Sequence, residues 1–174
     1  MFSDPLTNLK QFGLKSTDHV ADFGAGSGAY TIPAARMVRG GKVYAVEVQK
    51  DFLPRIKSEA EKEHLSNVET LWGDIENIGG TKIKEATMDA VILSSVLFQV
   101  GNKRGLVDET KRILKTGGRV LLIDWKDSFG GMGPRGDMII LKDTAKTLFE
   151  NSGFKYDHDI SVGEHHYGMI FKRT

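Results

Sequence analysis

Three glycines directly after a short apolar segment are the feature of this sequence with the clearest chemical meaning. Residues 19–23 favour a β-strand, and a stretch with helical spacing begins near residue 29. Between them lie Gly24, Gly26 and Gly28. Glycines at such a junction let the backbone turn sharply and approach a ligand, while the first helical amides point toward it. The pattern predicts a loop that binds a nucleotide-like cofactor.

Two classes of cofactor fit this loop. Gly24, Gly26 and Ala29 satisfy the dinucleotide-binding fingerprint with alanine in its last place. Asp22 favours another class, because a carboxylate suits a cationic cofactor that carries an amino acid and would repel a pyrophosphate. Asp22 and the glycine spacing resemble motif I of class I S-adenosylmethionine-dependent methyltransferases. We therefore expect S-adenosylmethionine, with S-adenosylhomocysteine as product, and a dinucleotide as the alternative.

Acidic residues also end the next two predicted strands. Glu47 closes the second, where a carboxylate can accept hydrogen bonds from both hydroxyls of a ribose. Dinucleotide enzymes use the same device, so Glu47 does not separate the two cofactors. Asp74 follows the third strand, placed to accept from an adenine amine while Ile75 packs on the ring. A cap of its own loop is the alternative role for Asp74.

The elements that position these residues alternate between strands and helices, which predicts a three-layer α/β fold around a mostly parallel sheet. The expected strands cover 19–23, 42–48, 68–72, 88–95, 119–125, 154–162 and 165–172. The expected helices cover 29–38, 51–64, 101–115 and 138–151. The last two strands should form a tight hairpin around Gly163-Glu164. Residues 1–18 should form a short helical leader, and 127–136 a glycine-rich loop.

The chain resembles the small, single-domain class I methyltransferases related to quinone-biosynthesis and arsenite methyltransferases. The resemblance rests on residues 22–28, 31–35, 43–47, 73–74, 88–91, 112–119 and 166–168. It implies one Rossmann-like domain over 1–174. It also implies a seven-stranded sheet of order 3-2-1-4-5-7-6 in which strand 7 is antiparallel.

The same resemblance implies a set of cofactor-binding residues. Those around the glycine loop would hold the methionine end, Glu47 the ribose, and the Gly73–Ile75 segment the adenine. Two serines at the end of strand four would line the methyl-transfer site. The set is Asp22, Phe23, Gly24, Ala25, Gly26, Gly28, Tyr30, Glu47, Val48, Gly73, Asp74, Ile75, Ser94 and Ser95. Relatives often carry a polar residue or histidine shortly after strand four, where this chain has Phe98-Gln99.

Candidate catalytic residues come from the last strand. If that strand is antiparallel, its first residues lie at the cofactor end beside residues 124–126. His165, His166 and Tyr167 are therefore candidates for a base or a substrate clamp. The alternative is that one histidine is exposed and the other is packed. We expect no metal, since no third ligand accompanies the histidine pair.

Composition excludes several classes of function. The 174 residues contain no cysteine, which removes disulfides, thiolate metal sites and cysteine nucleophiles. The net charge of +1 supplies no field that would draw the chain to nucleic acid or acidic membranes. Without a membrane-spanning apolar run or the pattern of a signal peptide, we expect a cytoplasmic protein, monomeric or homodimeric.

The expected methyl acceptor is a small molecule. Strand four ends in Ser94-Ser95, unlike the Asn-Pro-Pro-Tyr sequence of nucleic-acid amino methyltransferases. Basic residues gather over 103–119, but Asp108 and Glu109 dilute them, which favours a solvated face. An RNA or protein methyltransferase, and an S-adenosylmethionine-binding module without catalysis, stay open as alternatives.

Overall fold

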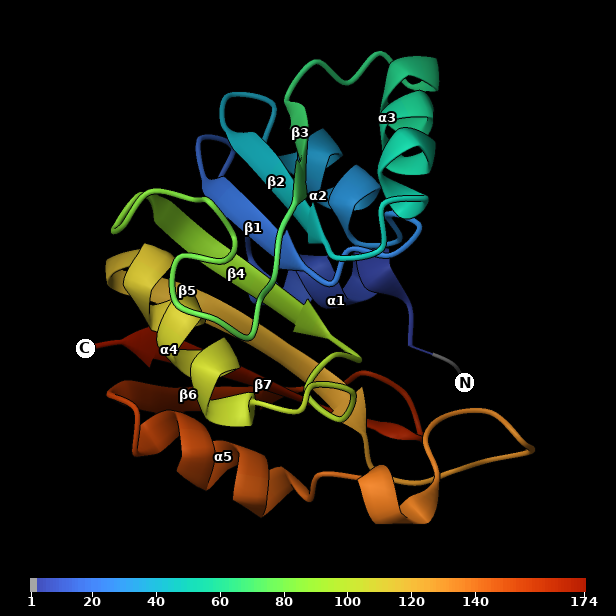
Figure 1. Ribbon diagram of the computed structural model, residues 1–174, viewed down its shortest axis with the longest axis vertical. Coiled ribbons are helices and arrows are strands. Elements are labelled where there is room, and N and C mark those ends of the chain that lie inside the picture. Colours follow the sequence, from blue (N-terminus) through green and yellow to red (C-terminus); the bar gives the residue numbers. More distant parts are fainter. Residues whose placement is uncertain (1–2) are drawn as a thin grey trace.

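The computed structural model describes residues 3–174 as one α/β assembly with a central sheet (Figure 1). The strands are β1 (His19–Phe23), β2 (Lys42–Glu47), β3 (Val68–Trp72), β4 (Met88–Ser94), β5 (Leu114–Trp125), β6 (Phe154–Ile160) and β7 (His166–Arg173). The helices are α1 (Pro5–Phe12), α2 (Thr31–Met37), α3 (Phe52–Lys62), α4 (Lys103–Ile113) and α5 (Lys142–Glu150), with a 3₁₀ turn at Gly136–Met138.

The strand order is β3-β2-β1-β4-β5-β7-β6, which confirms the predicted sheet. All neighbours from β3 to β5 are parallel, whereas β7 runs antiparallel to both β5 and β6. Chain order reverses beside β1, since β2 and β3 lie on one side of it and β4 on the other. Open α/β sheets bind ligands at this reversal, beyond the carboxyl ends of the strands.

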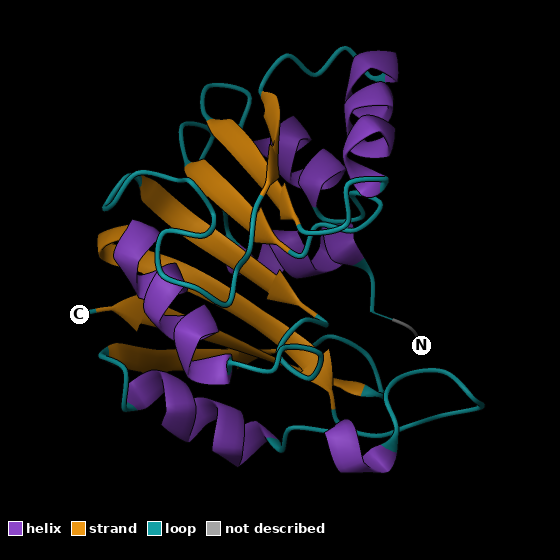
Figure 2. Ribbon diagram, viewed as in Figure 1, coloured by secondary structure: helices purple, strands orange, loops and turns teal. Residues whose placement is uncertain are grey.

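Successive residues of the central strands face opposite helical layers. On β4, Ile92 belongs to an apolar cluster with Leu9 of α1 and Ile32 of α2. Its neighbour Leu93 belongs to a second cluster with Phe149 of α5 and residues of α4. Both side chains are fully buried, as expected for a strand covered on both faces. The two layers thus lie on opposite faces of the sheet (Figure 2).

Several predicted boundaries are wrong where a tertiary contact decides the outcome. The β6–β7 connection is not a two-residue turn at Gly163-Glu164, because β6 ends at Ile160 and β7 begins at His166. β5 starts at Leu114, five residues before the predicted start, because Leu114 pairs with Met88 across a bulge. The last helix starts at Lys142, four residues later than predicted.

Residues 73–87 connect β3 to β4 without a helix (Figure 2). This long connection is held by Glu109 of α4, whose side chain is fully buried. The Glu109 carboxylate accepts hydrogen bonds from the Gly79 amide and from the amide and hydroxyl of Thr81. It also forms a bidentate pair with Arg112, which donates to the Ile83 carbonyl. A buried carboxylate thus fastens this segment together with the apolar packing of Ile75 and Ile83.

Replacing Glu109 by glutamine should lower the free energy of unfolding by about 1–3 kcal/mol, because a buried acceptor and the ion pair are lost. Urea denaturation followed by circular dichroism measures the change. The matched control is Asp108→Asn, which breaks only the exposed Arg104–Asp108 pair and should cost less than about 1 kcal/mol. Equal losses in both variants would contradict the anchoring role of Glu109.

Candidate active site

The predicted glycine loop turns at the carboxyl end of β1 with backbone angles that favour glycine. Gly24, Gly26 and Gly28 have φ of 68°, 54° and 90°. The Gly24 and Ala25 amides donate to the Val46 carbonyl of β2. A Cβ atom on Gly24 would lie 2.3 Å from Cγ1 of Val96, so the loop leaves no room for a side chain there. These glycines therefore let the loop run closely along β2 and the segment after β4.

The Glu47 carboxylate joins the glycine loop to the loop after β2. One oxygen accepts from the Gly26 amide at 2.9 Å. The other accepts from the Val48 and Gln49 amides, also at 2.9 Å. Glu47 is 7% exposed and faces a cavity, so its negative charge is held by backbone dipoles beside that cavity.

The cavity has a volume of about 460 Å³ and combines apolar walls with a few polar groups. Because it lies at the end of the sheet where the cofactor is predicted to bind, we call it the cofactor-end cavity. That composition is typical of a small-molecule site. The predicted residues that line it are Gly24, Gly26, Glu47, Val48, Gly73, Asp74 and Ile75. The lining residues that the prediction missed are Val46, Gln49, Phe52, Glu76, Val96, Gln99 and Val100. Five of the missed residues follow β2 or β4 within six positions, so extending the strand-end rule by six positions finds them.

Asp74 has the alternative role of a cap of its own loop, and it also lies at the cavity where adenine binding is predicted. It lines the cavity, and its carboxylate also accepts from the Glu76 amide at 2.8 Å and from the Asn77 side chain at 2.6 Å. Asp74 therefore caps its own loop and thereby shapes the wall that Gly73 and Ile75 complete.

Other predicted cofactor residues lie near the cavity without lining it. Phe23 and Ala25 are buried in apolar clusters, and the Tyr30 hydroxyl accepts from Asn8 of α1 at 2.8 Å. Ser94 ends β4, and Ser95 follows it. Ser95 has φ of 56°, unusual for a residue with a side chain, and turns the chain toward Val96.

Asp22 is 3% exposed and accepts a hydrogen bond from the hydroxyl of Thr31, the first residue of α2, at 2.6 Å. Burial raises the pKa of Asp22 to about 7; the Thr31 hydrogen bond opposes that shift and the Glu47 charge adds to it. A cation placed beside these two acids would relieve their repulsion.

The carboxyl end of β5 and the start of β7 meet as predicted. Trp125 pairs with His166 in the sheet, and Asp124 pairs with Tyr167. Asp124 accepts from the Phe98 amide at 3.1 Å, which ties this end to the loop that lines the cavity. Burial raises the pKa of Asp124 to about 6. A polar end of the sheet thus continues from the cofactor-end cavity to β7.

The three candidate catalytic residues have different surroundings. Nδ1 of His165 lies 2.6 Å from Oδ1 of Asp127. His166 is 9% exposed and its ring lies 4.1 Å from that of Trp125; within residues 3–174 its Nδ1 has no hydrogen-bond partner. The Tyr167 hydroxyl donates to the Ile140 carbonyl at 3.0 Å, and burial raises the pKa of Tyr167. Only His165 combines exposure with a carboxylate partner.

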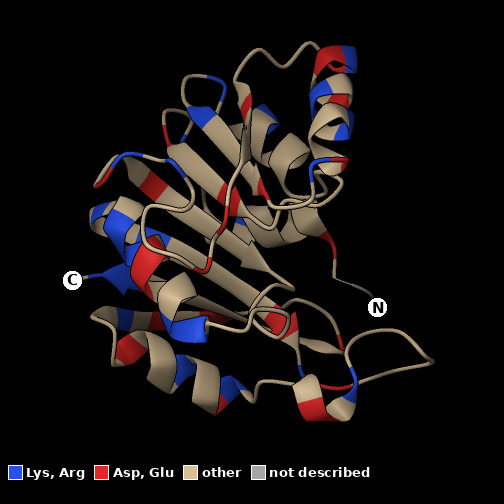
Figure 3. Ribbon diagram, viewed as in Figure 1, with Lys and Arg blue, Asp and Glu red and all other residues tan. Residues whose placement is uncertain are grey.

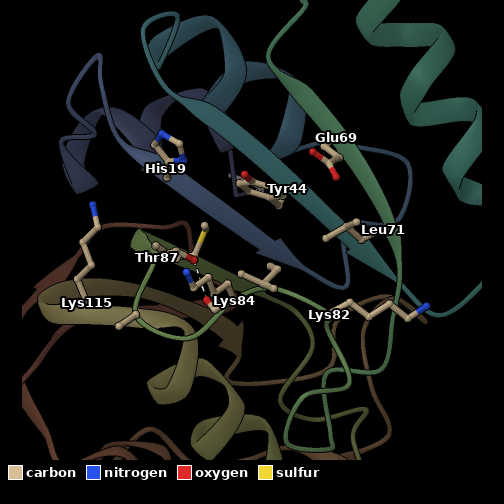
Figure 4. Close-up of a pocket in the computed structure, with 11 residues that line it drawn as sticks. His19, Tyr44, Glu69, Leu71, Lys82, Lys84, Thr87 and Lys115 are labelled. Carbon is tan, nitrogen blue, oxygen red and sulfur yellow. Dashed lines mark hydrogen bonds between the residues drawn. The ribbon is translucent and has the colours of Figure 1, made fainter.

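A second cavity, of about 470 Å³, lies near the amino ends of β1 and β4 (Figure 4). Tyr44 and Leu71 form its floor, and the helix-free 73–87 connection forms one side. Two of its charged lining residues form ion pairs, Glu69 with Lys42 and Lys115 with Asp89. The glycine loop and the acids at the carboxyl ends are at the other end of the strands, so this cavity takes no part in the candidate site.

Comparison with known proteins places the chain in a family. The family model described as "Methyltransferase domain" matches residues 14–165. The chain belongs to this family. The methyltransferase-domain match covers β1 to β6, ends one residue before β7, and so includes the glycine loop and the cavity.

Two curated relatives are methyltransferases by name. A segment of 84 residues is 32% identical to the "probable cobalt-precorrin-6B C(15)-methyltransferase (decarboxylating)" of Methanosarcina mazei, covering 48% of this chain and 44% of that protein. A segment of 106 residues is 29% identical to the arsenite methyltransferase of Halobacterium salinarum, covering 60% of this chain and 26% of that protein. The matches therefore span less than half the length of either relative.

Solved structures share the whole fold. A SAM-dependent methyltransferase from Aquifex aeolicus superposes with a TM-score of 0.89 at 27% identity, covering 99% of this chain and 91% of that one. The [4+2]-cyclase SpnF superposes with a TM-score of 0.83 at 16% identity, covering 98% and 81%. The second likeness extends to the fold alone.

Within residues 3–174, no helix is long and apolar enough to cross a membrane. The same residues contain no group of three His, Cys, Asp or Glu side chains arranged to hold a metal ion.

The raised pKa of Asp22 predicts a pH-dependent stability. From pH 4 to 7 the unfolded chain ionises Asp22 while the folded protein keeps it protonated, so this contribution to stability falls as pH rises through 7. Asp22→Asn removes the titration and preserves an acceptor for Thr31. Between pH 5 and 8 the wild type should lose roughly 2–3 kcal/mol relative to the variant. Urea unfolding at several pH values measures this; a constant difference would contradict it.

Proposed function

We propose that this chain is an S-adenosylmethionine-dependent methyltransferase that acts on a small-molecule acceptor. The observation that carries the proposal is the Glu47 carboxylate, fixed by backbone amides beside a glycine-walled cavity at the reversal of strand order. The family membership and the likeness to the SAM-dependent Aquifex aeolicus enzyme support the same function.

The residues present fit S-adenosylmethionine better than a dinucleotide. The cavity collects three acids, Glu47, Asp74 and Glu76, and Asp22 lies buried behind the glycine loop. Such an environment favours a ligand with positive charge and disfavours a pyrophosphate. Glu47 would take the ribose hydroxyls, and Asp74 and Ile75 the adenine. The Asp22 side of the glycine loop would hold the methionine end.

The chain would orient the two reactants and exclude water from them, rather than take part in covalent chemistry. S-adenosylmethionine supplies an activated methyl group on a sulfonium. In-line transfer of such a group depends mostly on how the two reactants are oriented. The apolar walls formed by Val96 and Val100 would exclude water, and the Ser95 kink would fix where those walls stand.

The acceptor class follows from charge and composition. The chain has no cysteine, so it cannot hold a soft acceptor such as arsenite through its own thiolates. Two of the four basic residues of α4 pair with acids of the same helix, Arg104 with Asp108 and Arg112 with Glu109. Figure 3 shows these acidic positions among the basic ones. A helix that carries acids among its basic residues attracts a phosphate backbone less strongly. A small organic acceptor is therefore favoured over RNA.

Glu47→Gln should weaken S-adenosylmethionine binding about ten- to a hundredfold, since one charged acceptor oxygen is lost. Isothermal titration calorimetry measures the affinity. The matched control is Glu69→Gln, which changes an acid at the edge of the second cavity and should leave the affinity unchanged. Unaltered binding in Glu47→Gln, or tighter binding of NADH than of S-adenosylmethionine, would overturn the assignment.

Transfer of a labelled methyl group tests the activity itself. The protein would be incubated with methyl-labelled S-adenosylmethionine and a cell extract, which is then separated into small molecules, RNA and protein. We expect label in the small-molecule fraction and much less of it in a reaction with Glu47→Gln at the same, subsaturating donor concentration. Label confined to RNA or protein would refute the acceptor class. Cofactor binding without any transfer would favour a binding module.

A further inference from the structure

Residues 127–136, called the flap here, follow β5 and project beyond the carboxyl end of the sheet (Figure 1). Phe129 and Met132 exchange two backbone hydrogen bonds around Gly130-Gly131. Both glycines have positive φ, 57° and 76°, as a two-residue hairpin turn requires. The flap thus contains a hydrogen-bonded hairpin turn. It presents two apolar side chains, Phe129 at 52% and Met132 at 44% exposure.

The flap is fastened to β5 and to the start of β7 by side-chain contacts. Phe129 stacks on His165 with ring centres 4.3 Å apart and an interplanar angle of 17°. A Cβ atom on Gly133 would lie 2.7 Å from the Trp125 ring, so the flap backbone packs closely against that indole. The hydroxyl of Ser128 donates to the Pro134 carbonyl and closes the base of the hairpin.

Asp127 orients His165 from the base of the same flap. A carboxylate accepts hydrogen bonds, so the 2.6 Å contact places the proton of a neutral His165 on Nδ1. Protons then enter or leave the ring at Nε2. The stacked Phe129 restricts the plane of the ring, and the His165 side chain keeps 18% exposure. This is the arrangement of a general base: a second group holds one nitrogen and leaves the other for a substrate.

The surroundings indicate a planar acceptor. The Phe129 ring stacks on His165, and the Trp125 ring lies against His166 and against Gly133 of the flap, so two ring pairs stand at this end of the sheet. Met132 adds an exposed, adaptable apolar side chain. Asp124 links this cluster to the Phe98 amide in the loop that forms a wall of the cofactor-end cavity. The flap therefore continues the site in which we place the cofactor.

We propose that the flap and His165 form the acceptor subsite, which takes a planar aromatic molecule bearing a phenol-type hydroxyl, with His165 as its base and Asp127 as the residue that positions His165. This inference rests on the proposed function. The acceptor oxygen forms a bond to the methyl carbon, the carbon–sulfur bond breaks with its electron pair left on sulfur, and the hydroxyl proton moves to Nε2 of His165. The resulting imidazolium is stabilised by the Asp127 carboxylate.

Binding of 2-naphthol to the protein saturated with S-adenosylhomocysteine tests the subsite without turnover. Decahydro-2-naphthol is the matched probe, with the same carbon skeleton and hydroxyl but no aromatic plane. We expect 2-naphthol to bind at least tenfold more tightly. Phe129→Ala should weaken 2-naphthol about five- to tenfold, because a ring contact is lost. Ile78→Ala, which removes another exposed apolar side chain far along the chain from the flap, should leave binding unchanged. Equal affinities for the two probes would overturn the aromatic subsite.

The absorption band of the naphtholate anion tests the base. At pH 7.5 the wild type should convert bound 2-naphthol in part to naphtholate, and His165→Gln should abolish this band while the neutral probe still binds. Asp127→Asn should reduce the band and Asp127→Glu should restore part of it. Bound 2-naphthol that stays neutral in the wild type, or a band that survives in His165→Gln, would remove His165 as the base.

Calorimetry with S-adenosylhomocysteine alone separates this proposal from the proposed function. If S-adenosylhomocysteine binds and 2-naphthol does not, the acceptor subsite is wrong and the methyltransferase assignment stands. If S-adenosylhomocysteine itself does not bind, the proposed function fails before the subsite is reached.

Discussion

The carboxylate of Glu47 is the interaction on which the candidate site depends. It binds the Gly26 amide with one oxygen and two amides of the following loop with the other. Two loops from adjacent strands are thereby held at a fixed spacing, and the cavity opens between them. Because the charge is stabilised by backbone dipoles, the acid stays buried without a basic partner from a side chain. A ligand with hydroxyl donors meets an acceptor that is already oriented, so less of its binding energy goes into ordering the protein.

Buried acids recur along the carboxyl ends of the parallel strands. Asp22 on β1 and Asp124 on β5 both have pKa values raised by burial, to about 7 and about 6. Each accepts a hydrogen bond from a donor beyond its own strand: Asp22 from the Thr31 hydroxyl, and Asp124 from the Phe98 amide in the loop after β4. A cationic ligand bound at this edge would favour the ionised form of both acids. Burial of the same acids makes stability depend on pH. It lowers the free energy of unfolding at neutral pH, and packing elsewhere in the sheet must offset that loss.

Much of the fold was predictable because its signals are local. Strand and helix periodicity, the glycine spacing and the acids at strand ends each depend on a few neighbouring residues, and the sheet order followed from the family that these motifs resemble. The predicted start of β5 was wrong because a residue distant in sequence extends the strand: Leu114 pairs with Met88 of β4. In the candidate site, the prediction found the acids and glycines that line the cavity. It missed Phe52, Val96 and Val100, since apolar wall residues resemble ordinary core residues in a sequence.

By itself the sequence determined the order of elements and the glycine loop, and it gave an expectation for the chemical character of the cofactor, because chain propensities and residue spacing encode these features. Only the tertiary structure decided how the contacts of the three candidate catalytic residues, His165, His166 and Tyr167, differ. His165 meets Asp127 across 38 positions, His166 packs on Trp125, and Tyr167 donates to Ile140. Such contacts depend on strand register and on the path of the flap, and no local sequence pattern predicts either of them. The role of a side chain in this protein therefore depends on which distant group the sheet brings beside it.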